Sequence, residues 1–135
     1  TNDATFATPG VNIGLFCSTP MVAVSRKVNR KRMIKMLLTG DPITAKYAKE
    51  IGLINDHFNK SKLNKEVFKL AKKISSKSNL TIKIGKKAFY KQLEMPLSKA
   101  YSYTSKVMSQ NMMSMDAKEG ISAFLSKRKP QWKNK

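Results

Sequence analysis

Apolar residues recur every three to four positions along most of this chain, which is the spacing of an amphipathic helix. The pattern is clearest over residues 62–75, where the apolar positions are Leu63, Val67, Leu70, Ala71 and Ile74. With capping and breaking residues as boundaries, it predicts further helices at 18–28, 30–38, 43–52, 80–92, 95–115 and from 116 until Pro130. Residues 4–8 predict a short strand, and residues 53–58 a second strand or extended edge. The chain is therefore expected to be mostly helical, with a little strand at its front.

Several predicted helix ends carry residues that ordinarily cap a helix. Asn29 precedes one helix, while Gly40 and Gly52 follow others at the position where a left-handed turn closes the last carbonyls. Asp41 and Asp116 stand where caps belong, so we expect both carboxylates to serve as caps.

One stretch departs from the general pattern. Residues 5–18, TFATPGVNIGLFCS, carry no charge and hold two glycines, a proline and the only cysteine. Such a loop can surround a ligand, or it can simply bury itself. Cys17 lies just ahead of a predicted helix, where a thiolate would be stabilised, which gives a weak hypothesis of a nucleophile. A buried small apolar residue is the interpretation we favour for a lone cysteine.

The strong positive charge of the chain raises the question of an anionic partner. The 135 residues carry a net charge of +19, which suits a nucleic acid, an anionic membrane or a phosphorylated ligand. Lysine supplies most of the 27 basic residues, whereas reading base edges favours the planar arginine fork. The lysines are spread from Lys27 to Lys135, with one short cluster at 127–129. We therefore favour solvated lysine-rich faces and expect no nucleic-acid partner.

Composition narrows the class of protein further. The 41% of hydrophobic residues can bury one domain's core, and no apolar run approaches the ~18 residues of a membrane span. We accordingly expect a soluble chain with no membrane partner, and no targeting segment is visible. A single cysteine excludes an internal disulfide and fits a reducing compartment. The start at Thr1, without an initiator methionine, raises the hypothesis that this is a piece of something longer.

The residues that ordinarily carry chemistry are scarce. His57 is the only histidine, and a surface or structural role suits it better than general-base work. One cysteine and one histidine cannot build a tetrahedral metal site, so no metal is expected. Glu50, Glu66 and Glu119 have lysine neighbours and are expected to be solvated. No pair of acids stands in an apolar setting, as general acid–base catalysis would require, so no catalytic residue is predicted.

The order of segments resembles the C-terminal half of the crotonase superfamily, the enoyl-CoA hydratases and isomerases. The resemblance rests on "FATPGVNIGLF", "MLLTGDPITAKYAKEIGLIN", "AKKISSKSN" and "KEGISAFLSKRKPQW", and it covers essentially all 135 residues. The second of these is the most specific to the superfamily. Within it, "FATPGVNIGLFCSTPMVAVSR" and "GKKAFYKQL" are most similar to the enoyl-CoA hydratase domain-containing protein 3 group.

The resemblance implies an α/β fold, a crotonase-like spiral of ββα turns, of which this chain holds the mostly helical C-terminal part with short N-terminal strands. Residues 1–58 would end the crotonase core, and residues 59–135 would form the helical region that builds trimers or hexamers. In the family, the two backbone donors that stabilise the enolate oxygen, the first catalytic glutamate and most of the adenosine pocket precede the strand at which this chain begins.

The same resemblance assigns substrate-binding positions. Pro9, Val11, Ile13 and Gly14 would line the acyl pocket, and Gly10 stands where hydratases carry their second catalytic glutamate. Lys127 matches a lysine that approaches the phosphate end of coenzyme A. Met108 matches an aromatic position that contacts coenzyme A.

We therefore expect an acyl-CoA-binding, crotonase-like protein, with coenzyme A as part of the substrate and no separate cofactor. Its partners would be an acyl-CoA thioester and further copies of itself, in the cytoplasm or, in a eukaryote, the mitochondrial matrix. Whether it is an enzyme is left open, and this chain alone is expected to be inactive as a hydratase. Two alternatives remain: a complete protein that runs another enolate reaction, such as isomerisation or thioester hydrolysis, and a basic nucleic-acid-binding module.

Overall fold

The computed structural model describes residues 1–134, and the chain divides into two compact units. The first runs from Thr1 to Phe68 and the second begins at Lys69. This division falls within one helix, α4 (Lys60–Ser75). The boundary expected near residue 58 stays a prediction, because it concerns how the chain joins a larger core.

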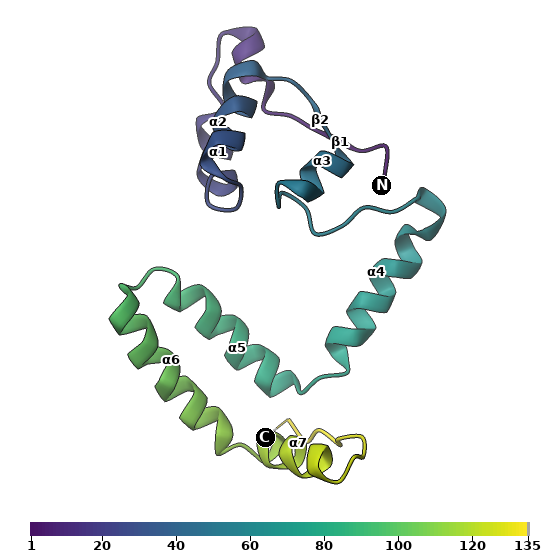
Figure 1. The fold of residues 1–135 in the computed structure, drawn as a ribbon, viewed down its shortest axis with the longest axis vertical. Helices are drawn as coiled ribbons and strands as arrows, with labels where there is room; N and C mark the ends of the chain where they lie inside the picture. Colours follow the sequence, from purple (N-terminus) through teal and green to yellow (C-terminus); the bar gives the residue numbers. More distant parts are fainter. Residues whose placement is uncertain (135) are drawn as a thin grey trace. The chain divides into compact units, whose positions relative to one another are not determined.

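The N-terminal unit combines two very short strands with short helices (Figure 1). In chain order its elements before α4 are β1 (Thr5–Phe6), the 3-10 helix η1 (Pro9–Ile13), α1 (Ser18–Val24), α2 (Arg30–Thr39), β2 (Ile43–Thr44) and α3 (Ala45–Glu50). The strands pair antiparallel, with Phe6 opposite Ile43. This pairing brings the chain just before η1 beside the chain that follows α2.

Local capping explains where α2 and α3 begin and end. The Asn29 side chain accepts a hydrogen bond from the Lys31 amide at 3.0 Å, and α2 closes at Gly40, whose φ is +67°. The helix at 30–38 is therefore confirmed to within one residue. Thr44 caps α3 by accepting from the Tyr47 amide at 3.2 Å, so the expectation that Asp41 would be a cap is wrong.

The core of the N-terminal unit lies under α2. Its buried side chains are Val28, Met33, Met36 and Leu37. Partly buried residues from α1, β2 and the segment after α3 pack against them, and Cys17 is among these. Cys17 is thus a packing residue, as the interpretation of it as a buried small side chain predicted.

Two further expectations for the N-terminal unit differ from the structure. The helix expected over 18–28 ends at Val24, because turns follow and carry the chain into α2. The segment 53–58, expected as a strand or extended edge, forms no strand, because its backbone bends at residues 53–55. Leu53 instead donates its amide to the Ala48 carbonyl at 2.8 Å, which folds the segment back onto α3.

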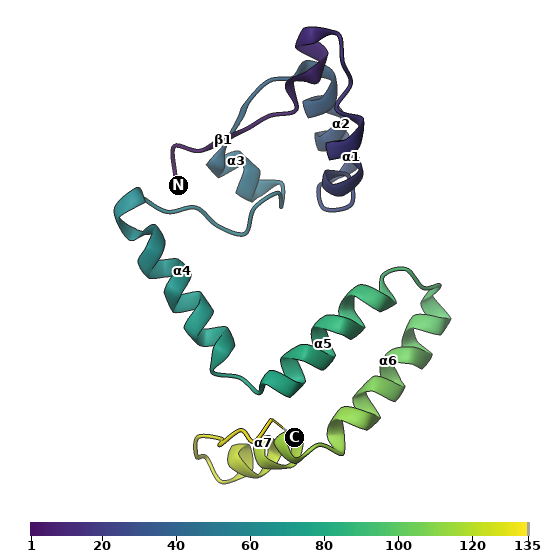
Figure 2. The ribbon, with the colours of Figure 1, turned by 180° about the vertical axis from the view of Figure 1, so that it is seen from behind.

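The C-terminal unit contains a helical hairpin formed by α5 (Asn79–Gln92) and α6 (Leu97–Met112), with α7 (Met115–Leu125) beside it. Figures 1 and 2 show α5 and α6 running antiparallel side by side, with α7 at the end where α5 begins and α6 ends. Small side chains are buried in these helices: Ala88, Ala100 and Ala123. Small residues at helix contacts allow the helix backbones to approach closely.

Three helix ends in this unit differ from expectation. α6 stops at Met112 instead of 115, and the cap of α7 is Ser114, which accepts from the Ala117 amide at 3.1 Å. Asp116 is therefore not the cap but a first-turn residue that is 1% exposed. α7 ends at Leu125, well before Pro130, because the chain reverses at Lys127.

No helix within residues 1–134 is both long enough and apolar enough to cross a membrane.

Candidate functional site

The uncharged loop at 5–18 presents apolar side chains to its surroundings rather than burying them. Ile13 is 76% exposed and Leu15 is 63% exposed. Contacts between η1 and α2 hold the loop against the core of the N-terminal unit. Of the residues expected to line an acyl pocket, Pro9, Ile13 and Gly14 are exposed and Val11 is partly buried. The loop thus presents an exposed apolar surface, and its η1 segment packs against α2.

Gly10 sits where a side chain has no room. Its amide donates a hydrogen bond to the Cys17 Sγ at 3.2 Å, and its carbonyl accepts from the Leu15 amide at 2.9 Å. A Cβ added at Gly10 would lie 2.8 Å from both the Cys17 Sγ and the Leu15 carbonyl oxygen. The loop therefore closes tightly around this position, and any other residue would require a backbone shift.

Two further glycines shape the same region. Gly14 has φ +75° and ends η1 in the left-handed region, which glycine enters without strain. Gly40, at the end of α2, leaves space that the Asn12 side chain fills, because a Cβ there would come within 2.9 Å of the Asn12 Nδ2. The absence of a side chain at Gly40 thus lets Asn12 of η1 lie close to the end of α2.

Thr8 is a buried polar residue at the entrance to η1. It is 7% exposed, and its hydroxyl oxygen has no hydrogen-bond partner among residues 1–134. Buried hydroxyls are ordinarily paired, so Thr8 is an exception in this unit.

The only histidine has a structural contact. The His57 Nδ1 lies 2.7 Å from the Asn2 side-chain oxygen, and the Asn2 amide donates to the Phe58 carbonyl at 3.0 Å. These bonds join the start of the N-terminal unit to the segment after α3. The interpretation of His57 as a structural residue is therefore supported.

Two hollows in the N-terminal unit are lined by residues outside the loop. One, of about 170 Å³, lies between α2 and the start of α3 and is lined by residues including Arg32, Lys35 and Tyr47. The other, of about 270 Å³, lies between α1 and α2 and includes Val22 and Ile34. None of the expected pocket residues at 9–14 lines either hollow.

The two remaining site positions belong to the C-terminal unit. Met108 lies on α6 with 60% of its surface exposed, and Lys127 lies two residues beyond α7 with an exposed side chain. The sequence interpretation grouped them with the loop. In the structure both belong to the C-terminal unit, whereas the loop belongs to the N-terminal unit.

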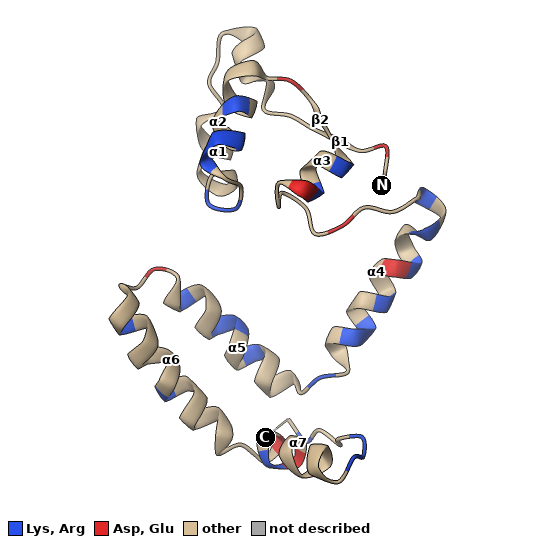
Figure 3. Cartoon of the chain, viewed as in Figure 1, with Lys and Arg blue, Asp and Glu red and all other residues tan. Residues whose placement is uncertain are grey.

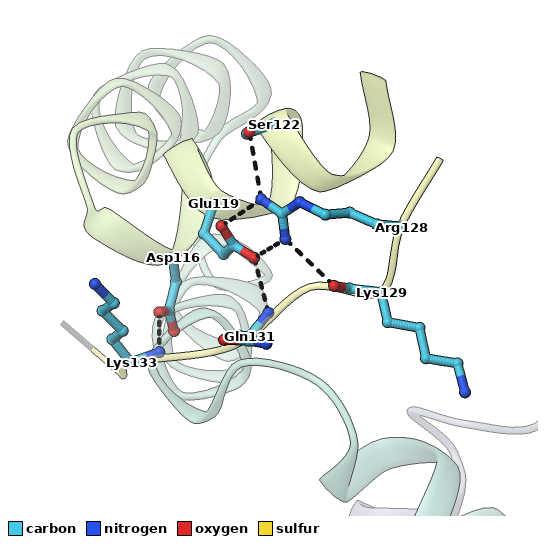
Figure 4. Close-up of polar contacts among 7 residues, drawn as sticks. All are labelled: Asp116, Glu119, Ser122, Arg128, Lys129, Gln131 and Lys133. Carbon is cyan, nitrogen blue, oxygen red and sulfur yellow. Dashed lines mark hydrogen bonds and ion pairs between the residues drawn. The ribbon is translucent and has the colours of Figure 1, made fainter. Parts of the chain in front are cut away.

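The chain after α7 folds back onto that helix and is held by Glu119. Arg128 donates to both carboxylate oxygens of Glu119, at 2.6 and 2.9 Å, and the Gln131 amide donates to the same carboxylate at 2.8 Å (Figure 4). The hydrogen bonds from Arg128, and then the one from Gln131, lower the pKa of Glu119 to about 2. The expectation that Glu119 is solvated is therefore wrong: only 20% of its side chain is exposed.

A second carboxylate anchors the end of this returning segment. Asp116 accepts hydrogen bonds from the Ser78 hydroxyl and from the amides of Lys133 and Asn134, the last two at 2.7 and 3.0 Å. Of these, the Ser78 hydrogen bond contributes most to lowering the pKa of Asp116 below its usual range. Trp132, which directly precedes Lys133, donates its ring N–H to the Ser76 carbonyl at 2.8 Å.

Sequence reasoning missed both carboxylate contacts. Arg128 follows Glu119 by nine residues, and 38 residues separate Ser78 from Asp116, so neither pair has the three- or four-residue spacing of neighbours on a helix. The one signal available was the run of polar and aromatic residues after α7, which pointed only to the end of a helix. No group of three His, Cys, Asp or Glu residues within residues 1–134 is arranged to hold a metal ion.

Comparison with known proteins places the whole chain in one family. Residues 1–135 match the family described as Enoyl-CoA hydratase/isomerase. The enoyl-CoA hydratase domain-containing protein 3, mitochondrial, of Mus musculus is 50% identical over 129 residues, which cover 96% of this chain and 43% of that protein. The Homo sapiens protein of the same description is 49% identical over 129 residues, with the same coverage.

Solved structures agree with this assignment. The crystal structure of the human enoyl-CoA hydratase domain-containing protein 3 is 48% identical, with a TM-score of 0.92, over 97% of this chain and 52% of that one. An enoyl-CoA hydratase of Mycobacterium smegmatis is 44% identical, with a TM-score of 0.93, over 97% and 51%. This chain therefore spans about half the length of the relatives that it matches.

These likenesses confirm the expected fold class, a part of a crotonase-like domain that is mostly helical with short strands. They also confirm the expected similarity to the group of domain-containing protein 3. On the match over residues 1–135, this chain belongs to the enoyl-CoA hydratase/isomerase family.

Proposed function

We propose that this chain forms part of an acyl-CoA-binding protein that does not hydrate enoyl thioesters by a pair of glutamates. The observation that carries the proposal is the closed environment of Gly10. A side chain at that position would collide with the Cys17 Sγ and with the Leu15 carbonyl, each 2.8 Å from a built Cβ. The place that a second glutamate would occupy is thus filled by the loop itself.

Hydration requires a group that orients and deprotonates water. Positioned general acid–base groups contribute typically ~10²- to 10⁴-fold to a rate. Asn12 is the nearest polar side chain in η1, and its amide cannot take up a proton. We therefore expect the complete protein to bind acyl-CoA while hydrating it slowly. Another enolate reaction, isomerisation or thioester hydrolysis, would need an acid from outside this loop.

The apolar surface of η1 supports an acyl-binding role. Ile13 and Leu15 are exposed beside Pro9, and no charge lies within residues 5–18, so this surface suits an uncharged acyl chain. On this proposal Pro9, Val11 and Gly14 complete the wall. Coenzyme A enters as part of the substrate, without a separate cofactor.

Lys127 and Met108 are proposed to contact the coenzyme A part of the substrate. Lys127 has an exposed side chain, and its positive charge suits the phosphate groups of coenzyme A. Met108 offers an exposed, pliable apolar side chain in place of an aromatic ring. A mitochondrial location and assembly into trimers or hexamers are part of the same proposal, the first because the similar animal proteins are named mitochondrial.

The placement of charge gives little support to the nucleic-acid alternative. Figure 3 shows Lys and Arg on α2 through α7 instead of gathered along one helix. Nucleic-acid affinity would fall steeply with salt and be indifferent to coenzyme A, whereas acyl-CoA binding would require the thioester carrier.

The test uses the complete protein, crotonyl-CoA and a saturated acyl-CoA. We expect the saturated acyl-CoA to bind, and the hydration rate to lie about 10²- to 10⁴-fold below that of a two-glutamate hydratase assayed alongside. Hydration at the rate of that enzyme would overturn the proposal, and so would the absence of acyl-CoA binding. Gly10→Glu is expected not to restore hydration, because its Cβ meets the Leu15 carbonyl.

A further inference from the structure

The turn that ends α7 has lysine at a position ordinarily taken by glycine. The Arg128 amide donates to the Ala123 carbonyl at 3.0 Å, and the Lys127 amide donates to the Phe124 carbonyl at 3.2 Å. This pair of hydrogen bonds is the Schellman motif, whose turning residue adopts a left-handed conformation. That residue is Lys127, with φ +53°.

A lysine in this conformation is strained where glycine would not be. The Cβ of an L-residue in the left-handed region crowds the following carbonyl oxygen, so glycine is the usual occupant of this turn. Strained residues persist where the surrounding structure fixes them, and they gather at functional sites. The presence of lysine instead of glycine at position 127 therefore indicates a role for the lysine side chain.

The neighbours of Lys127 supply the fixing contacts. Arg128 binds Glu119 with both arms of its guanidinium, and the same guanidinium donates to the Lys129 carbonyl at 3.3 Å. The Gln131 amide binds Glu119 from further along. The residues after Lys127 are thus tied to α7, which orients the bond from its Cα to its Cβ. Figure 4 shows Arg128 reaching back to Glu119 from the returning segment.

The three adjacent basic residues at 127–129 differ in their contacts. The charge of Arg128 is matched by Glu119, so Arg128 is engaged within the protein. Lys127 and Lys129 have exposed side chains. Between these two, Lys127 is the one with a strained backbone.

We infer that Glu119 and Arg128 are positioning residues that hold Lys127 in its left-handed turn so that its ammonium group meets the phosphates of an acyl-CoA. This inference rests on the proposed function. It adds an ion pair, Glu119 with Arg128, that acts on the ligand only through the orientation of Lys127.

The first test separates the strain of Lys127 from its charge. Lys127→Gly in the complete protein should raise the thermal midpoint, because glycine relieves the left-handed strain. The same variant should weaken acyl-CoA binding by about tenfold, because a hydrogen-bonded charge is lost. Changes of opposite sign support the inference. Unchanged affinity for acyl-CoA would overturn it.

The second test addresses the positioning pair by comparing two ligands. Acyl-CoA carries the phosphates, whereas the matching acyl-pantetheine lacks them. Arg128→Lys keeps the charge but loses the two-armed contact with Glu119, and Glu119→Gln removes the carboxylate. Both should lower the preference for acyl-CoA over acyl-pantetheine by about threefold or more, with acyl-pantetheine affinity unchanged. Unchanged acyl-pantetheine affinity also shows that each variant has folded.

A matched control distinguishes position from charge. Lys129→Ala removes the neighbouring exposed lysine, which has no left-handed backbone, and should leave the preference unchanged. An equal loss from Lys129→Ala would overturn the inference in favour of a diffuse basic surface. A second contrary result is that the wild-type protein binds acyl-CoA while Arg128→Lys and Glu119→Gln keep the wild-type preference for acyl-CoA over acyl-pantetheine. That result would overturn this inference and leave the proposed function standing. If the wild-type protein does not bind acyl-CoA, the proposed function fails with it.

Discussion

The hydroxyl of Ser78 donates a hydrogen bond to the carboxylate of Asp116, and this contact joins the start of α5 to the start of α7. The same hydroxyl oxygen caps α5 by accepting from the Thr81 amide at 3.1 Å. Both residues are buried, with 3% and 1% of their surfaces exposed. One buried pair therefore connects two helices and, through the amides that bind Asp116, the segment that returns from α7.

Ser78→Ala is expected to destabilise the C-terminal unit by more than the loss of a cap. A cap alone contributes about 1 kcal/mol, and this variant also removes a donor from a buried carboxylate. Ser114→Ala is the matched control, because the Ser114 side chain caps α7 by accepting from the Ala117 amide. Chemical denaturation of both variants measures the difference. Equal losses would show that the Ser78–Asp116 contact adds nothing beyond capping.

Gly10→Ala is expected to lower the free energy of unfolding by roughly 1 to 3 kcal/mol, the range for forcing atoms into a packed site. Its methyl group would lie 2.8 Å from a sulfur and from a backbone oxygen. Gly85→Ala in α5 meets nothing within 4 Å and should stabilise by about 0.5 to 1 kcal/mol, because alanine favours helix. Thermal unfolding of the Gly10→Ala and Gly85→Ala variants measures both changes in stability. A Gly10→Ala variant as stable as the wild type would show that the loop has room for a methyl group at position 10.

The contribution of Glu119 to stability is expected to depend on pH only in acid. The pKa of Glu119 is lowered to about 2 in the folded protein, from an ordinary value of 4.5. A lowered carboxyl pKa stabilises the folded state above the ordinary value, and this stabilisation is lost as pH falls from 4.5 through about 2. The difference in unfolding free energy between wild type and Glu119→Gln should therefore be constant near neutrality and shrink below pH 4.5.

The Arg128→Gln background provides the control for this pH dependence. Without the guanidinium, the largest cause of the lowered pKa is gone, so Glu119→Gln should show a much smaller dependence on pH in the same range. A dependence of the same size in both backgrounds would contradict the assignment to Arg128.

The 135-residue chain is expected to associate with itself through α6. Leu97, Tyr101, Met108 and Met112 form one stripe at helical spacing, and each has more than half of its surface exposed. Exposed apolar stripes of this kind mark contacts between chains. Tyr101→Glu should weaken association, whereas Ser102→Glu, outside the stripe, should not. Light scattering at micromolar concentration decides the matter, and a monodisperse monomer would count against the prediction.

Much of the helical architecture was predictable because it depends on neighbours in the chain. The apolar spacing over residues 62–75 identifies α4, and Asn29 with Gly40 defines the two ends of α2. Caps act within one turn, so the residue types at 29 and 40 were enough to locate the ends of α2. The family resemblance was likewise carried by local motifs, and it identified Gly10 and Lys127 as positions of the expected site.

The tertiary structure decided what those positions are. Gly10 is enclosed because the loop returns to place Cys17 against it, and Lys127 is strained because the chain reverses and Arg128 reaches Glu119. Asp116 is suited to be a cap by its sequence position, yet it is buried because Ser78 comes from a different helix. By itself the sequence determined most of the helices, both ends of α2 and the family. Contacts between distant segments decided the surroundings of the site, because no local pattern encodes which distant group completes a hydrogen bond.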